Sequence, residues 1–369
     1  MKAYKLRFYP TLFQRKQLAR EFNCCRFVWN WALGQRIETY RNEEKTLNAV
    51  ALSRKLTLLK VSTPFLKRVS ATTLNNVLWS LDDAYSRFFK KQNKFPKFKK
   101  IHHRGSCCYQ LDKRRGAKIF INQNLISLPK LGKCKIVWSR NINVMPDSAT
   151  VSKDAKGRYW ISLQVNEIVK CDFVKTNKTI GIDLGLKYFI ATSDGVKVKP
   201  LKPMKVLLRT LQIQQRKLSK KVKGSTNRKK QRVCVARIHA KIADQRVNFC
   251  HQLSTSICRH NDAVTIEDLC VRGMLANRKL ARSISDSSWS EFTRQLKYKA
   301  QWYHRELTEV PRFQRTTGVC PACGHVGDKL LLNVRNWDCI CGATHDRDIA
   351  AAKVIDQIGN RARSVQIKA

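Results

Sequence analysis

Acidic residues are scarce in this chain. Of its 369 residues only 26 are Asp or Glu, against 73 Lys or Arg, so the formal net charge is +47. A compact protein with so few acids repels itself strongly and is expected to work beside a polyanion. Nucleic acid is the obvious candidate, with binding that weakens as salt rises. Composition alone leaves a ribosome-like or merely adhesive basic protein as the alternative.

Long apolar runs and internal repeats are also missing. The longest uncharged stretch, Val69–Leu81, has 13 residues and contains Ser, Thr and Asn, so it is too short and too polar to span a bilayer. The first ten residues carry Lys2, Lys5 and Arg7 and lack the apolar segment of a signal peptide. We therefore expect a cytoplasmic protein without a membrane partner. Its length and its 43% apolar residues allow two or three folded domains.

Cysteine, by contrast, is plentiful. Ten of the 14 cysteines are scattered, which is typical of reduced core residues and not of a disulfide framework. The other four form Cys320-Pro-Ala-Cys323 and, after 15 residues, Cys339-Ile-Cys341. Four thiolates in one short segment predict a zinc ribbon with one Zn²⁺. The second pair is one residue shorter than the usual Cys-x-x-Cys, so His345 is a substitute candidate for the fourth ligand.

The apolar pattern of the first half predicts a small β-domain interrupted by helices. Residues 2–9 read as a strand closed by Pro10, and residues 12–92 repeat apolar side chains at helical spacing. Short strands are expected at 119–122, 125–128 and 131–138, and a hairpin at 149–165 that turns at Lys156-Gly157. We expect the lone first strand to join that sheet.

The second half changes character. Residues 178–185, 188–192 and 196–199 predict a three-stranded antiparallel meander, and residues 263–268 another strand. Residues 205–223 and 227–259 predict two long amphipathic helices that turn at Gly224-Ser225.

Two segments concentrate basic side chains. Residues 87–100, RFFKKQNKFPKFKK, suit phosphate contact with base stacking, although a solvated linker with buried Phe rings fits them equally well. Residues 216–241 carry 11 Lys or Arg and no acid, which favours phosphate contact. The candidate nucleic-acid-binding residues are Lys90, Lys91, Lys97, Lys99, Lys220, Lys221, Lys223, Arg228, Lys229 and Lys230.

Three acids lie where chemistry is expected. Asp183 and Glu267 end short apolar strands, and glycines beside Asp183 leave room for a backbone or a phosphate. Either acid alone is often only a satisfied turn residue, and Asp346 or Asp348 can cap the Ala-rich helix that follows them. Together, Asp183, Glu267 and Asp348 match a nuclease site in which carboxylates converge on two Mg²⁺ or Mn²⁺ ions.

These motifs resemble those of the TnpB (OrfB) family, the RNA-guided nucleases of bacterial insertion sequences and relatives of type V CRISPR effectors. The resemblance covers nearly the whole chain. It is carried by CRFVWNWAL (25–33), GIDLGLKYFIATSDG (181–195), the basic helix pair (223–254), the segment beginning TIEDLC (265–303), CPACG (320–324) and WDCICGATHDRDIAAAKVI (337–355).

The resemblance implies an α/β and α+β multidomain protein. A RuvC, RNase H-like nuclease domain is expected at 173–312 and 346–369, with a zinc-ribbon insert at 313–345. A wedge-like β-domain is expected at 1–10 and 96–172, and a helical recognition domain at 11–95. It also implies Asp183, Glu267 and Asp348 as catalytic metal ligands, since the second Asp of HDRD is the catalytic one. Guide RNA and double-stranded target DNA are the implied partners, with no obligate protein partner, and the protein would read a short motif beside the target.

Two positions depart from the family pattern: the shortened second cysteine pair, and Ala350, where the family usually has Asn. Neither removes a catalytic acid. We therefore expect a metal-dependent DNA endonuclease associated with a transposable element. A guided DNA-binding repressor without useful cleavage, and a transposase or its accessory protein, are the alternatives.

Overall fold

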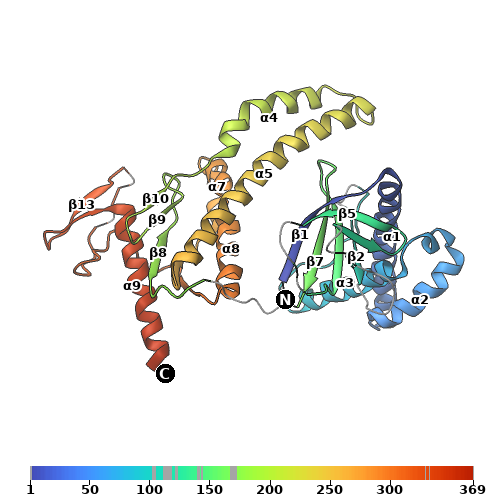
Figure 1. Ribbon diagram of the computed structural model, residues 1–369, viewed down its shortest axis with the longest axis horizontal. Coiled ribbons are helices and arrows are strands. Elements are labelled where there is room, and N and C mark those ends of the chain that lie inside the picture. Colours follow the sequence, from blue (N-terminus) through green and yellow to red (C-terminus); the bar gives the residue numbers. More distant parts are fainter. Residues whose placement is uncertain are drawn as a thin grey trace. The chain divides into compact units, whose positions relative to one another are not determined.

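The computed structural model describes residues 2–101, 105–110, 119–120, 124–138, 142, 144–166, 173–328, 330–331 and 333–368. The chain forms two compact units, Met1–Ile168 and Val169–Ala369. Figure 1 shows the elements of each unit. Two sequence expectations fall outside the described residues: the end of the strand predicted at 119–122, and the burial of Cys171.

The first unit is built on a seven-stranded antiparallel sheet of order β2-β6-β7-β1-β5-β4-β3. Its strands are β1 (Lys2–Tyr9), β2 (Ser106–Gln110), β3 (Ile119–Phe120), β4 (Leu125–Leu128), β5 (Gly132–Val137), β6 (Ser148–Lys153) and β7 (Tyr159–Val165). Tyr4, Leu6 and Phe8 of β1 alternate into the core, as the period of a strand requires. The first strand therefore joins the later sheet, as predicted, and it lies between β7 and β5.

Helices separate β1 from the rest of that sheet in sequence. They are α1 (Leu12–Glu43), α2 (Ala49–Ser62), the 3₁₀ turn η1 (Pro64–Arg68) and α3 (Ala71–Phe89). Thr11 begins α1 with a capping box, since its hydroxyl accepts from the Gln14 amide and the Gln14 side chain accepts from the Thr11 amide. Leu18, Val28 and Leu74 pack into the same core as β1. The predicted helical stretch is thus three helices and a short turn.

The second unit contains a mixed five-stranded sheet of order β10-β9-β8-β11-β12. Its strands are β8 (Thr179–Asp183), β9 (Ile190–Thr192), β10 (Lys197–Val198), β11 (Ala263–Glu267) and β12 (Glu306–Val310). The first three form the predicted antiparallel meander, and β11 runs parallel to both β8 and β12. Because β8 and β11 are parallel neighbours, their carboxyl ends, Asp183 and Glu267, lie at the same edge of the sheet.

Helices flank this sheet. They are α4 (Pro203–Ser219), α5 (Thr226–His260), α6 (Val271–Met274), α7 (Ala281–Ser287), α8 (Trp289–Trp302) and α9 (Arg347–Lys368). Figure 1 shows α9 on one side of β8 and β9, and α5 and α8 on the other. Residues of α5 and α8, including Cys250, Ile257 and Phe292, share a buried apolar cluster with Ile182 and Ile266 of the strands.

Two glycines allow α9 to approach the sheet closely. A Cβ atom at Gly181 would lie 2.1 Å from the backbone oxygen of Ala352, and one at Gly359 would lie 1.9 Å from Thr265 Oγ1. The space that the sequence offered beside Asp183 is therefore filled at Gly181 by the backbone of α9. This contact places the start of α9 against the strands that carry the other two acids.

The predicted helix pair is present. Gly224, with φ of +88°, and Ser225, whose side chain accepts from the Arg228 amide, connect α4 to α5. A two-stranded antiparallel sheet of β13 (Asn336–Asp338) and β14 (Thr344–Asp346) precedes α9. Among the helices in the described ranges, none combines the length and the apolar character that crossing a lipid bilayer requires.

Candidate active site and zinc ribbon

Asp183, Glu267 and Asp348 are brought together by the second unit. Asp183 ends β8, Glu267 ends β11, and Asp348 lies in the first turn of α9. The charges of Glu267 and Asp348 both act on Asp183, which requires the three carboxyl groups to be near one another. Residues separated by more than 160 positions thus meet at one edge of the sheet.

Asp346 and Asp348 have different surroundings. Asp346 Oδ1 accepts from the backbone amides of Asp348 and Ile349, each at 3.1 Å, so Asp346 caps α9. Its Oδ2 also forms an ion pair with Lys197 Nζ at 2.5 Å. The Asp348 side chain takes no part in the cap, and its Oδ1 lies 3.4 Å from Arg335 Nη1. The capping interpretation therefore applies to Asp346 and leaves Asp348 beside the other two acids.

Burial and mutual repulsion make this cluster unfavourable as three bare anions. Burial, and then the negative charges of Glu267 and Asp348, raise the pKa of Asp183 from 3.8 to about 8, against the opposing charge of Arg347. Burial also raises the pKa of Glu267, which a hydrogen bond from Thr316 opposes. At neutral pH such a cluster retains a proton unless a cation compensates it. Carboxylate oxygens of this kind suit Mg²⁺ or Mn²⁺.

Asp183→Asn should stabilise the protein in magnesium-free buffer as the pH rises. The pKa of Asp183 is higher in the folded state than in the unfolded chain, so its protonation stabilises the protein at low pH, and this contribution is lost as the pH rises through 8. Asparagine does not ionise. The melting temperature of the variant relative to wild type should therefore increase by about 5 °C between pH 6 and pH 9. A difference in Tm that is independent of pH would contradict the raised pKa of Asp183.

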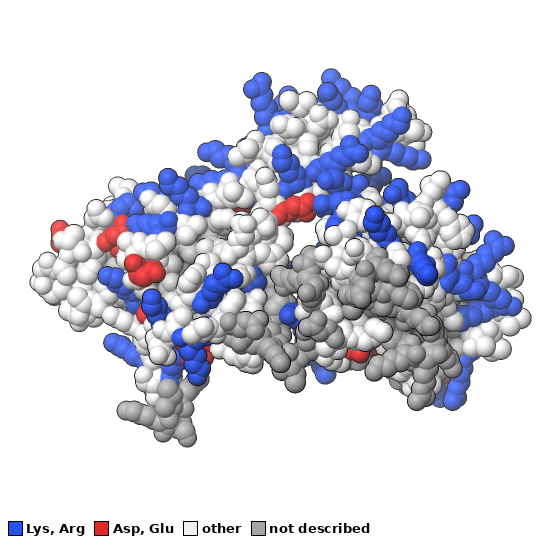
Figure 2. Space-filling view, viewed as in Figure 1, with Lys and Arg blue, Asp and Glu red and all other residues white. Residues whose placement is uncertain are grey.

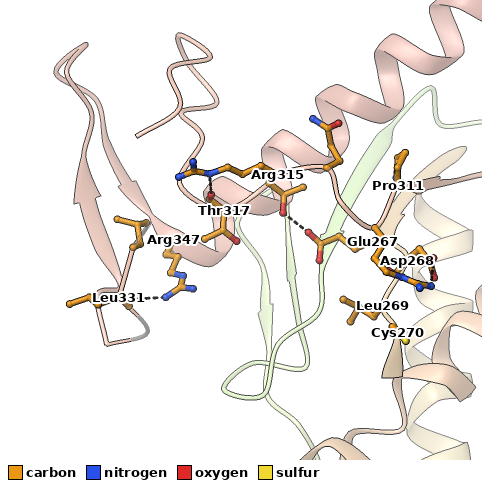
Figure 3. A pocket seen from close by; sticks show the side chains of 13 residues that line it. Glu267, Asp268, Leu269, Cys270, Pro311, Arg315, Thr317, Leu331 and Arg347 are labelled. Atoms are coloured by element: carbon orange, nitrogen blue, oxygen red, sulfur yellow. Dashed lines mark hydrogen bonds and ion pairs between the residues drawn. The ribbon is translucent and has the colours of Figure 1, made fainter. Parts of the chain in front are cut away.

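A groove of about 1030 Å³ opens beside Glu267 (Figure 3). Three arginines line it, namely Arg312, Arg315 and Arg347. Arg312 is ion-paired with Asp268 at 2.7 Å, and Arg347 Nη1 donates to the Leu331 carbonyl at 2.9 Å. The lining residues are Glu267, Asp268, Leu269, Cys270, Pro311, Arg312, Gln314, Arg315, Thr316, Thr317, Leu330, Leu331 and Arg347. A groove with an acid on its wall and guanidinium groups around it suits a phosphate chain whose reacting group lies near the acids.

The four clustered cysteines form a compact thiol site. Their Sγ atoms all lie within 4.8 Å of one another. The Cys320–Cys341 and Cys323–Cys339 pairs are 3.8 and 3.6 Å apart. Four thiolates bound to zinc at 2.3 Å in a tetrahedron would be about 3.8 Å apart. The cluster is therefore compatible with one zinc ion, and the shortened second pair does not keep Cys341 out of it.

His345, the substitute ligand candidate, lies beside this cluster. Its Nε2 is 3.1 Å from Cys320 Sγ, and its ring packs on Trp337 with the centroids 5.0 Å apart. Because all four thiols already lie within 4.8 Å of one another, His345 is better placed to donate an N–H to the Cys320 sulfur. Such outer hydrogen bonds orient metal ligands.

Comparison with known proteins identifies the family. A putative RNA-guided DNA endonuclease of Streptomyces pristinaespiralis is 40% identical over 359 residues, which cover 96% of this chain and 88% of the relative. The putative RNA-guided DNA endonuclease InsQ of Escherichia coli K12 is 30% identical, covering 98% of this chain and 92% of the relative. The probable transposase family of OrfB proteins matches residues 163–278. The chain belongs to the TnpB family.

Further matches concern single segments of the chain and its fold. Residues 289–355 of this TnpB-family protein match the Cas12f1-like TNB domain. Residues 1–45 match a family described as a helix-turn-helix domain, although they form β1 and the single long helix α1. A solved Cas12f1–sgRNA–target DNA complex has a similar fold, with a TM-score of 0.56 at 13% identity, covering 94% of this chain and 82% of the Cas12f1 chain.

The basic residues predicted to bind nucleic acid have two kinds of surroundings in this TnpB-family protein. Lys99 is half-buried with Nζ 3.7 Å from the Trp29 ring centroid, and Arg228 Nη1 donates to the Leu218 and Lys221 carbonyls, both at 2.8 Å. Arg228 therefore joins the end of α4 to the start of α5. The other eight are exposed: Lys90, Lys91, Lys97, Lys220, Lys221, Lys223, Lys229 and Lys230. Figure 2 shows Lys and Arg side chains gathered over the α4–α5 hairpin.

The aromatic residues of the first basic segment are neither fully buried nor isolated. Phe88 contacts Phe89 and Phe95, with ring centroids 5.3 Å apart in both pairs. Phe89 is 68% exposed and Phe95 is 43% exposed, so the interpretation with fully buried rings is wrong for these two. An exposed ring cluster among lysines keeps base stacking possible.

Three residues near the acids were not singled out from the sequence of this TnpB-family protein. Thr316 donates a hydrogen bond to Glu267, Arg335 pairs with Asp348, and the charge of Arg347 acts on Asp183. Arg347 lies within the HDRD motif, directly before Asp348, so its position in the sequence could have indicated that it lies near the acids. Thr316 and Arg335 lie in the ribbon segment, and neither periodicity nor spacing indicates which acid they meet.

Proposed function

We propose that this protein is an RNA-guided DNA endonuclease that hydrolyses phosphodiester bonds with Asp183, Glu267 and Asp348 as catalytic metal ligands. The observation that carries the proposal is the placement of the three acids: Asp183 and Glu267 end adjacent parallel strands, and Asp348 lies in the first turn of α9. The names of the two full-length relatives, both putative RNA-guided DNA endonucleases, support the substrate and the guide.

The chemistry follows from the donor set. Two Mg²⁺ or Mn²⁺ ions, when bound, would activate water and stabilise the leaving oxygen. Asp183, Glu267 and Asp348 would hold them, and the raised pKa of Asp183 is the physical reason why cations are favoured there. The Arg335 side chain, now beside Asp348, and Arg347 are near enough to the acids to contact a phosphate and balance its charge.

We further propose the finer assignments that the family resemblance implied. The second unit would be a RuvC, RNase H-like nuclease domain, because a mixed sheet with acids at adjacent strand ends and a helix that brings the third acid fits that fold. Zinc would be held by Cys320, Cys323, Cys339 and Cys341. The first unit would contain the wedge-like β-domain and the helical recognition domain.

Guide RNA and double-stranded target DNA are the proposed partners. The exposed lysines at the α4–α5 turn would contact phosphates, and Phe89 and Phe95 would stack on unpaired bases beside the lysines that follow α3. The formal charge of +47 supports a long polyanionic partner.

Replacing Lys220, Lys229 and Lys230 together by alanine should weaken RNA binding without changing which RNA is preferred. Each lost contact with single-stranded phosphate lowers the slope of log K against log salt by about 0.7, so three should lower it by about 2. The measurement is a binding titration with the cognate RNA at several salt concentrations.

A charge-matched control separates local contact from net charge. Lys178, Lys279 and Lys353 are also exposed, and they lie outside the helix pair. Replacing these three by alanine removes the same charge and should leave the slope closer to wild type. Equal slopes for the two triple variants would show that the hairpin makes no special phosphate contact.

The function itself is tested by RNA sequencing and plasmid cleavage. The protein is co-expressed with the RNA encoded beside its gene, purified, and the bound RNA is sequenced. The complex should cut a plasmid that carries the matching target when Mg²⁺ is present, and should leave a plasmid with an unrelated sequence intact. Random host RNA in the purified protein, together with no target-dependent cleavage, would refute the proposal.

A further inference from the structure

Glu267 is held by one hydroxyl group in the part of the chain that the structure describes. Thr316 is 6% exposed, and its Oγ1 donates a hydrogen bond to Glu267 Oε1. The bond directs one carboxylate oxygen to Thr316 and leaves the other, Oε2, for a cation. It also favours the charged form of Glu267 against the effect of burial.

Thr316 comes from outside the strands that carry the acids. It follows the turn after β12, in which the Gln314 amide donates to the Pro311 carbonyl at 2.9 Å, and it precedes the first zinc-ribbon cysteine, Cys320. The Arg312–Asp268 ion pair, at 2.7 Å, ties the start of this turn to the residue that follows β11. The position of the hydroxyl then depends on the contacts that the residues around Thr316 make within the zinc-ribbon segment.

The ribbon fixes the chain on both sides of Thr316. On one side, Arg315 donates to the Gly327 carbonyl. On the other, the Gly318 carbonyl accepts from the Gly327 amide at 3.0 Å, and Val319 forms a β-bridge with Val326. Gly318 has φ of +75°, a conformation that suits glycine. These contacts close the loop that carries Cys320 and Cys323, so the first cysteine pair and Thr316 belong to one small folded element.

We propose that Thr316 is a positioning residue that orients Glu267 for the divalent cation, and that the first cysteine knuckle of the ribbon sets its place. This inference rests on the proposed function, because it requires Glu267 to be a metal ligand. Hydrogen-bond partners of metal-binding carboxylates commonly change metal affinity or activity by 10- to 100-fold when they are removed. The zinc ribbon thereby contributes to the nuclease site through a contact that does not involve nucleic acid.

The test compares Thr316→Val, which keeps the shape and removes the hydroxyl, with Thr316→Ser, which keeps the hydroxyl. Full-length zinc-loaded protein, freed of RNA, is titrated with Mn²⁺ alone while its melting temperature is followed. The Mn²⁺ concentration for half-maximal target cleavage is then measured with the RNA complex. Thr316→Val should need about tenfold more Mn²⁺ in both measurements, and Thr316→Ser should lie close to wild type.

Three further variants make the outcome decisive. Thr308→Val makes the same substitution in β12, at a residue whose register partner is Thr265 and not Glu267, and should behave as wild type. Asp183→Asn should remove most of the Mn²⁺-dependent rise in melting temperature. Cys323→Ser, which changes an exposed thiol of the knuckle, should raise the Mn²⁺ requirement in the same direction as Thr316→Val.

Each contrary result has its own meaning. If wild type binds Mn²⁺ and Thr316→Val binds it equally well, the positioning role is overturned and the proposed function stands. If Thr316→Ser is as impaired as Thr316→Val, packing of the methyl group and not the hydrogen bond is responsible, and the inference is again overturned. If wild type and Asp183→Asn respond identically to Mn²⁺, the metal site fails, and with it both proposals.

Discussion

Asp183→Ala should reduce target cleavage at least about 1,000-fold while RNA-guided binding of the target changes little. Asp183 ends β8, and the charges of Glu267 and Asp348 both act on it. Its loss would therefore remove one of the three carboxylates proposed to hold the cations. Metal-assisted hydrolysis depends on the cations for several kcal/mol of transition-state stabilisation, which corresponds to a loss of this size. Cleavage of a linear target with Mg²⁺ and guide RNA, and a binding titration of the same duplex, measure the two effects.

An adequate control removes another aspartate from the same meander. Asp194 is exposed in the turn between β9 and β10, where it accepts a hydrogen bond from Thr192. Asp194→Ala should therefore cleave at nearly the wild-type rate. Wild-type cleavage by Asp183→Ala would rule out the site, and equal loss of cleavage by both variants would show that the meander tolerates no change and that Asp183 has no special role.

Cys341→Ser should abolish stable zinc retention, whereas His345→Ala should keep one zinc per chain. The four sulfurs lie within 4.8 Å of one another, two pairs are at 3.8 and 3.6 Å, and His345 lies beside them against Cys320. Structural zinc contributes about 10 kcal/mol or more to small domains of this kind, so loss of a ligand should unfold the ribbon. Elemental analysis of the purified variants gives the stoichiometry directly.

The two variants also distinguish the alternatives left by the shortened second cysteine pair. If His345 is the fourth ligand, His345→Ala loses zinc and Cys341→Ser retains it, which is the reverse of our expectation. Cys234→Ser is a suitable control, because this thiol lies within α5 and outside the cluster. It should leave the zinc content at one ion per chain.

Much of the site was predictable because each acid follows a local rule. Asp183 and Glu267 follow buried strands, and parallel strands bring such residues to one edge. Asp348 was harder, because Asp346 is equally good as a helix cap by sequence. The family resemblance selected Asp348, and the two amide hydrogen bonds to Asp346 now supply a physical reason. The assignment of all three as metal ligands remains a prediction.

What the sequence could not supply lies in contacts between distant segments. The strand β12, Glu306–Val310, has only one fully buried residue, so the apolar pattern does not reveal it, yet it pairs along the whole of β11. Thr316 and Arg335 meet Glu267 and Asp348 only because the ribbon folds back on the sheet edge. Such partners depend on tertiary packing, for which periodicity carries no information.

The close approach of α9 to the sheet has a consequence for biosynthesis. The backbone of α9 lies close to Gly181, and Gly359 of α9 lies close to Thr265. Asp348 lies in the first turn of the same helix. A ribosome completes the meander and the basic hairpin long before it reaches residue 348. A prematurely terminated polypeptide that ends before α9 would keep its lysine-rich regions but lack the third acid and expose the face of the strands that α9 covers. If Asp348 is the metal ligand that we propose, the nascent chain would lack a complete set of catalytic acids until α9 has docked.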